Sequence, residues 1–270
     1  MKEGKNNEIV EKIITYSNQI HLPAVRKYLN EELDTARSKN LSYEEFLCSI
    51  LEKEYDMRVD NGKLARIRIA GFPCRKYIED LKIEELPADG ANKLKMLTSL
   101  EFIKSGTNVI LAGSTGTGKT HISIGLGIKA AIAGYRVFFT TVPLLINQLK
   151  EARGASTLRS FELRFEKYDL VIADELGYIS FDKEGSELLF TNLSLRAGRK
   201  STIITTNLSF ERWDEIFLDP VITAAMIDRL THKSYMVNMN GPSYRMKETK
   251  EWLAKQKEAE QFLDGDVNKN

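Results

Sequence analysis

A glycine-rich segment limits the possible folds of this chain more than any other part of its sequence. The apolar run NVILA, from Asn108, leads directly into Gly-Ser-Thr-Gly-Thr-Gly-Lys-Thr, and a helical pattern then continues to Gly134. A segment of the form G-x-x-x-x-G-K-[ST] between a strand and a helix curls so that successive backbone N–H groups face one small space. The sequence therefore predicts an α/β domain whose first strand carries a phosphate-binding loop.

Four more strand-like runs follow, separated by stretches long enough for helices. They are RVFFT from Arg136, DLVIAD from Asp169, STIITT from Ser201 and SYMVNM from Ser234. Each run is nearly continuously apolar and rich in β-branched or aromatic residues, as expected for parallel strands covered on both faces. Strands that alternate with helices in this way indicate a doubly wound α/β fold.

The loop residues have the chemistry that a nucleoside triphosphate needs. Glycines allow the backbone N–H groups from about Gly116 to Thr120 to point at phosphate oxygens, and the following helix adds its positive amino-terminal dipole. Lys119 supplies a charge to the β- and γ-phosphates, and the Thr120 hydroxyl is a ligand for Mg²⁺. The alternative is a glycine-rich turn without a ligand. The expected nucleotide-binding residues are Gly113, Ser114, Thr115, Gly116, Thr117, Gly118, Lys119 and Thr120.

An acidic pair ends the third strand-like run, in DLVIADE. Asp174 in this position can bind Mg²⁺, and Glu175 can orient or deprotonate an attacking water. A whole strand, RVFFT, separates the loop from this pair, which favours the additional-strand ATPases with a catalytic glutamate over kinases and small GTPases. No N-K-x-D segment for reading guanine is present. The alternative is that both acids simply end a strand in solvent.

Three more polar residues are candidates for the same chemistry. Asn207 follows the fourth run and can position water near the γ-phosphate, or it can cap the next helix. Arg229 lies just before the last run and can act as an arginine finger on a neighbouring subunit's nucleotide, or it can pair with an acid such as Asp228. Arg245, in Gly-Pro-Ser-Tyr-Arg, can reach the phosphates within its own chain.

The first part of the chain has helical periodicity and no chemical motif. Residues 1–62 are expected to form a helical domain, whose apolar stripes serve either its own core or a partner. Within it, Pro23 suits a first helical turn, and Ser42 with Glu45 forms a capping box at the start of a further helix.

A basic run follows the helices, and we expect it to be a linker over residues 63–76. It contains five cations and no acid: Lys63, Arg66, Arg68, Arg75 and Lys76. Gly71 and Pro73 interrupt it, as is typical of a hinge. Such a run is either a solvated face or a surface that contacts the phosphates of nucleic acid. Residues 77–250 then form the ATPase domain, and residues 251–270 form a charged tail that is expected to fray.

Composition excludes several other classes. The chain has 39 basic and 38 acidic residues, so any surface for nucleic acid must be local. No run approaches the roughly 18 apolar residues of a membrane span, and the amino terminus is charged. The two cysteines and three histidines are scattered, without the spacing of a zinc site or a disulfide framework. We therefore expect a cytoplasmic protein without a membrane partner.

Four segments together resemble a known family. They are the residues from Asn108 to Thr140, DLVIADELGY, ITTNLSFERW and DRLTHKSYMVNMNGPSYR. Their combination is similar to the IstB-type ATPases, the helper proteins of insertion-sequence transposition, with DnaC-type helicase loaders and the DnaA initiator as more distant AAA+ relatives. The preceding helices and LARIRIAGFPCRK also fit the amino-terminal pattern of this family.

The resemblance implies an AAA+ core with a five-stranded parallel sheet and ATP bound between subunits. It implies a homo-oligomer that assembles on duplex DNA with low sequence specificity and recruits and stimulates a cognate transposase. ATP and Mg²⁺ are the implied cofactors, Glu175 the catalytic glutamate, Asn207 the first sensor, Arg229 the finger and Arg245 a second sensor. A replicative helicase loader is the alternative function.

The family also has an extra helical element that faces DNA, here at about residues 142–167. Its cations exceed its acids only by five to three, which would not by itself indicate DNA binding. With the basic run, it supplies the expected DNA-binding residues Lys63, Arg66, Arg68, Lys150, Arg153, Arg159 and Arg164.

Overall fold

The computed structural model describes residues 2–267, and the chain divides into two compact units, Met1–Ala65 and Arg66–Asn270. The first unit contains α1 (Lys2–Gln19), α2 (Pro23–Lys39) and most of α3 (Tyr43–Ile69). Its small core is formed by Ala24, Val25, Leu29 and Ile50, all less than 9% exposed.

The capping box at the start of α3 is confirmed. The backbone N–H of Ser42 donates to a Glu45 carboxylate oxygen at 2.7 Å, and the N–H of Glu45 donates to the Ser42 hydroxyl at 3.2 Å. These bonds satisfy two of the N–H groups that have no partner in the first turn of a helix. A second acid, the buried Glu54, accepts a hydrogen bond from the N–H of Ala24 near the start of α2.

The expected linker does not begin at residue 63. Helix α3 continues through Ile69, so the first half of the basic run is helical, and the two compact units divide between Ala65 and Arg66. The reason is that apolar residues recur at helical spacing beyond Gly62: Ile67 and Ala70 are buried in the core of the second unit. The helix ends where Gly71 adopts a φ of +80°.

The second unit has a five-stranded, fully parallel sheet, as expected. Its strands are β1 (Asn108–Ala112), β2 (Val137–Thr141), β3 (Leu170–Leu176), β4 (Ser201–Thr206) and β5 (Ser234–Asn238). Their order across the sheet is β2-β3-β4-β1-β5. Every strand matches one of the predicted apolar runs, because these runs are buried by helices on both faces.

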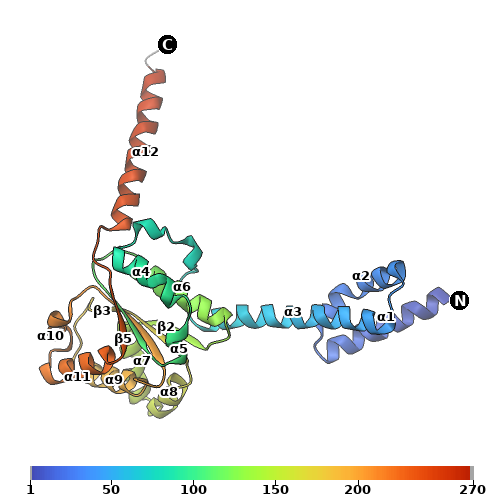
Figure 1. The fold of residues 1–270 in the computed structure, drawn as a ribbon, viewed down its shortest axis with the longest axis horizontal. Helices are drawn as coiled ribbons and strands as arrows, with labels where there is room; N and C mark the ends of the chain where they lie inside the picture. The colour runs from blue at the N-terminus through green and yellow to red at the C-terminus, as the bar shows by residue number, and fades with distance from the viewer. Residues whose placement is uncertain (1, 268–270) are drawn as a thin grey trace. The chain divides into compact units, whose positions relative to one another are not determined.

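Helices cover the two faces of this sheet (Figure 1). One face packs against α4 (Ala88–Leu97), α5 (Glu101–Lys104) and α6 (Lys119–Ile132). The other packs against α7 (Val142–Gly154), α9 (Lys183–Ser194), α10 (Asp214–Phe217) and α11 (Pro220–Thr231). Helix α8 (Leu158–Phe165) follows α7, so the extra helical element expected after the second strand is a pair of helices.

The end of the chain differs from the expected tail. Helix α12 spans Tyr244–Val267, so the residues from 251 to 267 are helical, and residues 268–270 lie outside the described residues. The remaining short elements are the 3-10 turns η1 (Ile78–Asp80), η2 (Ile83–Glu85) and η3 (Phe210–Arg212). Among the described residues, no helix is both long and apolar enough to cross a membrane.

Candidate nucleotide-binding site

The glycine-rich loop connects β1 to α6, at the edge of the sheet where all the parallel strands end. Gly116 and Gly118 have φ angles of +82° and +95°, in the left-handed region that glycine adopts without strain. Gly118 directly precedes α6, which begins at Lys119. The loop therefore presents backbone N–H groups at the amino terminus of a helix, the arrangement that binds phosphate.

Two glycines have a further role that the loop motif does not predict. A Cβ on Gly113 would lie 2.2 Å from the backbone of Met239, and one on Gly116 would lie 2.1 Å from the Ser243 hydroxyl. The segment after β5 also bonds to the loop: Asn240 Oδ1 accepts from the N–H of Ser114, and the N–H of Tyr244 donates to the Gly116 carbonyl. Only glycine permits this close approach.

Asp174 lies beside Thr120, as expected for a shared magnesium site. The Thr120 hydroxyl donates to the Asp174 carboxylate at 3.1 Å, and the Thr205 hydroxyl on β4 donates to the same carboxylate at 2.5 Å. Asp174 is only 2% exposed, and this burial raises the pKa of its carboxyl group, against the two hydroxyl donors and the charge of Lys119. A cation at this point would therefore stabilise the ionised form.

Glu175 has an unusual backbone conformation. Its φ is +65°, and the pairing of β3 with β4 shifts register between Ala173 and Leu176. The Thr205 hydroxyl accepts a hydrogen bond from the Glu175 N–H at 3.0 Å, so one threonine contacts both acids of the pair. A non-glycine residue in this region costs of order 1–3 kcal/mol and is typical of functional sites.

Lys119 is almost completely buried. Its ammonium donates to the carbonyls of Gly113 and Ser114 at 2.7 and 2.6 Å. Burial lowers the pKa of this lysine to about 8; the nearby Asp174 raises it and Arg245 lowers it further. The loop thus already orders the one cation that the motif assigns to the phosphates.

These groups surround a cavity of about 580 Å³. Residues 115–121 form one wall, with Glu175, Thr205 and Arg245 beside them. The irregular segment with η1 and η2 also lines the cavity, through residues that include Lys76, Leu81 and Leu86, and the sequence analysis did not assign this segment to the nucleotide site. Such a segment has no periodicity, so no sequence pattern indicated its role.

Arg245 and Arg229 occupy different places. Arg245 lines the cavity of its own chain from the first turn of α12. Arg229 is exposed in the last turn of α11, does not line that cavity, and forms no ion pair with Asp228 or any other described acid. The salt-bridge alternative for Arg229 is therefore not observed in residues 7–256.

Asn207 follows the end of β4 and does not cap the next helix, since η3 begins after Ser209 without a side-chain cap. Its Oδ1 atom is buried and accepts no hydrogen bond from the described residues. A buried amide oxygen without a partner is rare and calls for a missing donor, such as a water molecule.

The residues present fit a magnesium nucleotide. The loop offers N–H groups and a lysine for phosphates, and Thr120 and Asp174 offer the hard oxygen ligands that Mg²⁺ prefers. No described cluster of three or more histidine, cysteine or acidic residues could bind a metal alone. A magnesium ion here would take its other ligands from phosphate and water, as is usual for this ion.

The family of IstB-like ATP binding proteins matches residues 15–252. The chain belongs to this family. The ATP-binding protein of insertion sequence IS5376 from Geobacillus stearothermophilus is 34% identical over 248 residues, which cover 92% of this chain and 99% of the relative. The IS21 ATP-binding protein of Pseudomonas aeruginosa is 37% identical over 216 residues, 80% of this chain and 82% of the relative.

Solved structures share the fold of a large part of this IstB-like chain. The crystal structure of DnaI matches with a TM-score of 0.53 and 20% identity, over 61% of this chain and 91% of DnaI. The replication initiator DnaA bound to AMPPCP and single-stranded DNA matches with the same TM-score and identity, over 66% of this chain and 54% of DnaA. At this identity the likeness concerns the fold alone.

Most of the basic residues expected to contact DNA have acidic neighbours in the IstB-like structure. The pairs are Lys63–Asp60, Lys150–Asp182, Arg153–Glu184 and Arg159–Glu162.

Arg66 donates to the carbonyl of Ala131 at 2.7 Å and therefore has a structural role. Arg164 lies over the ring of Phe161, and Arg68 is exposed.

Proposed function

We propose that this chain is a magnesium-dependent ATPase that assembles on duplex DNA and recruits and stimulates a transposase at the target site. The observation that supports it best is that Lys119, Thr120 and Glu175 line one cavity beneath a loop shaped for phosphate, and that Asp174 accepts a hydrogen bond from Thr120. The printed names of the relatives place them in insertion sequences, which makes a transposase the partner that we propose.

Each residue has a defined part in the proposed hydrolysis. The loop N–H groups and Lys119 bind the β- and γ-phosphates, and Thr120 and Asp174 bind Mg²⁺, which neutralises charge on the phosphates. Glu175 accepts a proton from the attacking water, and Asn207 orients that water through its unpartnered amide oxygen. Thr205 fixes both acids through its hydroxyl.

The two arginines act on the nucleotides of different subunits. Arg245 lines its own cavity and therefore acts on the nucleotide of its own chain. Arg229 is exposed, free of ion pairs with described acids and away from that cavity, so its charge is available to a nucleotide on a neighbouring subunit. In this proposal ATP joins adjacent subunits and its hydrolysis loosens them. The DNA contacts are made to phosphates by cations and are weakly sequence-specific.

The test is to measure ATP hydrolysis with and without duplex DNA while recording particle size by light scattering. We expect DNA to stimulate hydrolysis, and ATP to increase the particle size. Lys119→Ala should abolish both effects, because the loop loses its only buried cation. Particles of constant size and a rate indifferent to DNA would contradict the proposal. Specific capture of a hexameric helicase would instead favour a helicase loader.

A further inference from the structure

Lys76 is the last cation of the basic run, and it lines the nucleotide cavity together with Thr120 and Glu175. The other four cations of the run do not line this cavity: Lys63, Arg66, Arg68 and Arg75. Neither the glycine-rich motif nor the acidic pair gives Lys76 a part in nucleotide binding. Its position therefore separates it from the rest of the basic run.

The backbone next to Lys76 is packed against the first turns of α6. The Tyr77 carbonyl accepts a hydrogen bond from Nε2 of His121 at 2.9 Å. A Cβ on Gly125 would lie 2.7 Å from the Ile78 side chain, so glycine at this point of the helix permits the close approach of the segment. The fold thus fixes the place of Lys76 at the amino-terminal end of α6, where the phosphates of a nucleotide are expected.

The charge of Lys76 has no partner of its own. Lys76 is half-buried, and among the residues whose side chains the structure describes it forms no ion pair and no hydrogen bond. Burial raises the pKa of the Asp174 carboxyl group, and the charge of Lys76, like that of Lys119, acts to lower it. Because Coulomb attraction falls off with distance, Lys76 lies on the side of the cavity where Asp174 and Thr120 meet.

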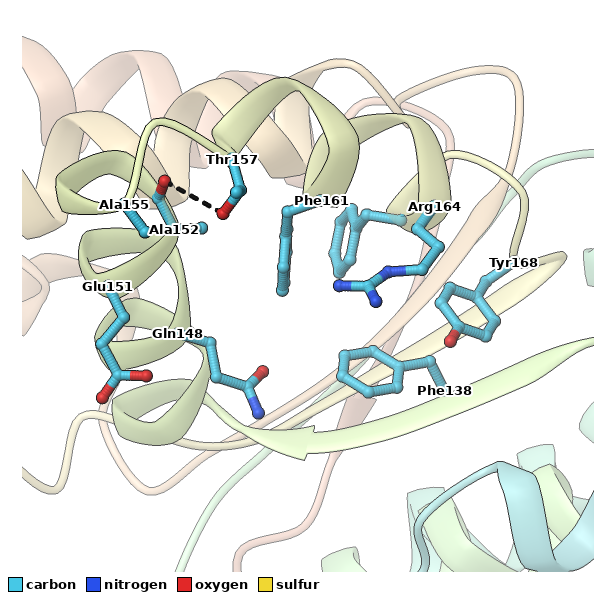
Figure 2. A pocket seen from close by; sticks show the side chains of 10 residues that line it. Phe138, Gln148, Glu151, Ala152, Ala155, Thr157, Phe161, Arg164 and Tyr168 are labelled. Carbon is cyan, nitrogen blue, oxygen red and sulfur yellow. Dashed lines mark hydrogen bonds between the residues drawn. The ribbon is translucent and has the colours of Figure 1, made fainter.

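A second cavity, of about 510 Å³, offers no comparable cation (Figure 2). Its one basic lining residue is Arg164, whose guanidinium lies 5.6 Å from the centre of the Phe161 ring and is already engaged by it. The acidic Glu151 lines this cavity too. An anionic ligand is therefore favoured at the nucleotide cavity and not at the second one.

We infer that Lys76 contacts the γ-phosphate of bound ATP and makes the site select ATP over ADP. In the proposed function, Thr120 and Asp174 hold a Mg²⁺ ion that bridges the β- and γ-phosphates. A cation on that side of the cavity then meets the γ-phosphate, which ADP lacks. The inference rests on the proposed function and adds to it a phosphate contact from the segment before β1.

The test measures the affinity of the full chain for two nucleotides by titration calorimetry with Mg²⁺: ADP and AMPPCP, an ATP analogue that is not hydrolysed. Lys76→Met should weaken AMPPCP binding roughly 10- to 100-fold, the usual effect of losing a hydrogen bond to a charged group, and change ADP binding less than about twofold. Lys76→Arg, which keeps the charge, should retain most of the affinity for AMPPCP. Thermal melting establishes that each variant is folded.

Arg75→Met is the matched control. It removes the neighbouring cation of the same run, which is exposed and does not line the cavity. Both affinities should therefore stay at their wild-type values. Weakening of AMPPCP binding as large as in Lys76→Met would show that the charge of the whole run matters, and would overturn a specific contact of Lys76.

Chemical labelling of the wild-type protein gives a second measurement that needs no variant. Acetic anhydride modifies lysine amines, and mass spectrometry reports the extent of modification at each lysine. AMPPCP with Mg²⁺ should protect Lys76 more than ADP with Mg²⁺ does, because only AMPPCP carries the γ-phosphate. Lys12, which is exposed and outside the cavity, is the internal reference.

The outcomes separate this contact from the proposed function. If Lys76→Met loses affinity for both nucleotides equally, or for neither, the γ-phosphate contact is wrong and the proposed function still stands. Equal protection of Lys76 by ADP and AMPPCP leads to the same conclusion. A wild-type protein that binds neither nucleotide overturns both proposals.

Discussion

Thr205 has more influence on the candidate site than its residue type suggests. Its hydroxyl donates to Asp174 and accepts from the N–H of Glu175, so it fixes both the proposed magnesium ligand and the proposed catalytic base. Thr205→Val removes this hydroxyl and should lower kcat roughly 10- to 100-fold, the usual effect of losing a hydrogen bond to a charged group. Thr205→Ser, which keeps the hydroxyl, is the control. Turnover of the valine variant at the wild-type rate would remove Thr205 from the mechanism.

Lys119 leads to a prediction about pH at the same scale. Burial lowers the pKa of its ammonium to about 8 in the free protein, and only the protonated form attracts phosphate. Above about pH 8 the protonated fraction of Lys119 falls nearly tenfold per pH unit. ATP binding must then be accompanied by uptake of a proton, so the affinity for ATP should fall as the pH rises. Titration calorimetry between about pH 7 and pH 9.5 measures this decline. A constant affinity over that range would contradict the assignment.

The loop and the connection between β5 and α12 act together as elements. Gly116→Ala would place a methyl group 2.1 Å from the Ser243 hydroxyl at a φ of +82°. The strained backbone alone costs about 1–2 kcal/mol, so we expect a lower Tm together with weakened ATP binding. Gly154→Ala is a matched control, since a Cβ there meets nothing within 4 Å. If the two alanine variants had the same Tm and the same affinity for ATP, the close approach of Gly116 to Ser243 would contribute nothing to stability or to ATP binding.

Elements were predictable where their signals are local. The five strands and the loop follow from short runs of sequence, and Ser42 with Glu45 marks the start of α3. The end of α3 was predicted too early, because Ile67 and Ala70 extend the helix by packing against residues distant in the sequence. The start of α12 after β5 likewise depends on bonds to the loop.

The candidate site was predictable only in part, for the same reason. The loop, Asp174 and Glu175 belong to recognisable segments. Loop residues and Glu175 line one cavity, and Asp174 contacts the Thr120 hydroxyl of the loop. Thr205 was not identified, because a threonine within a strand is ordinarily a packing residue. A second cavity, lined by Phe138, Phe161, Phe165 and Tyr168, combines residues of β2 and α8 with the segment before β3.

At the scale of the whole molecule, the proposed role of Arg229 requires a second copy of the chain, because Arg229 does not line the cavity of its own chain. Arg229→Ala and Glu175→Gln subunits should each be inactive alone, because each lacks one half of a shared site. Mixed together, they should regain some hydrolysis, since some interfaces then combine an intact Glu175 with an intact Arg229. A coupled phosphate-release assay measures the recovery. If hydrolysis did not recover at any mixing ratio, Arg229 would be an ordinary surface residue without a role in hydrolysis.

Assembly controlled by the γ-phosphate is the central claim, and sedimentation of the Glu175→Gln variant with duplex DNA tests it most directly. This variant should bind ATP without hydrolysing it, because the loop and Lys119 are intact. With ATP and Mg²⁺ it should form a stable multi-subunit assembly on DNA, and with ADP it should dissociate. Sedimentation as the same species in ATP and ADP, whether free or on DNA, would contradict the account.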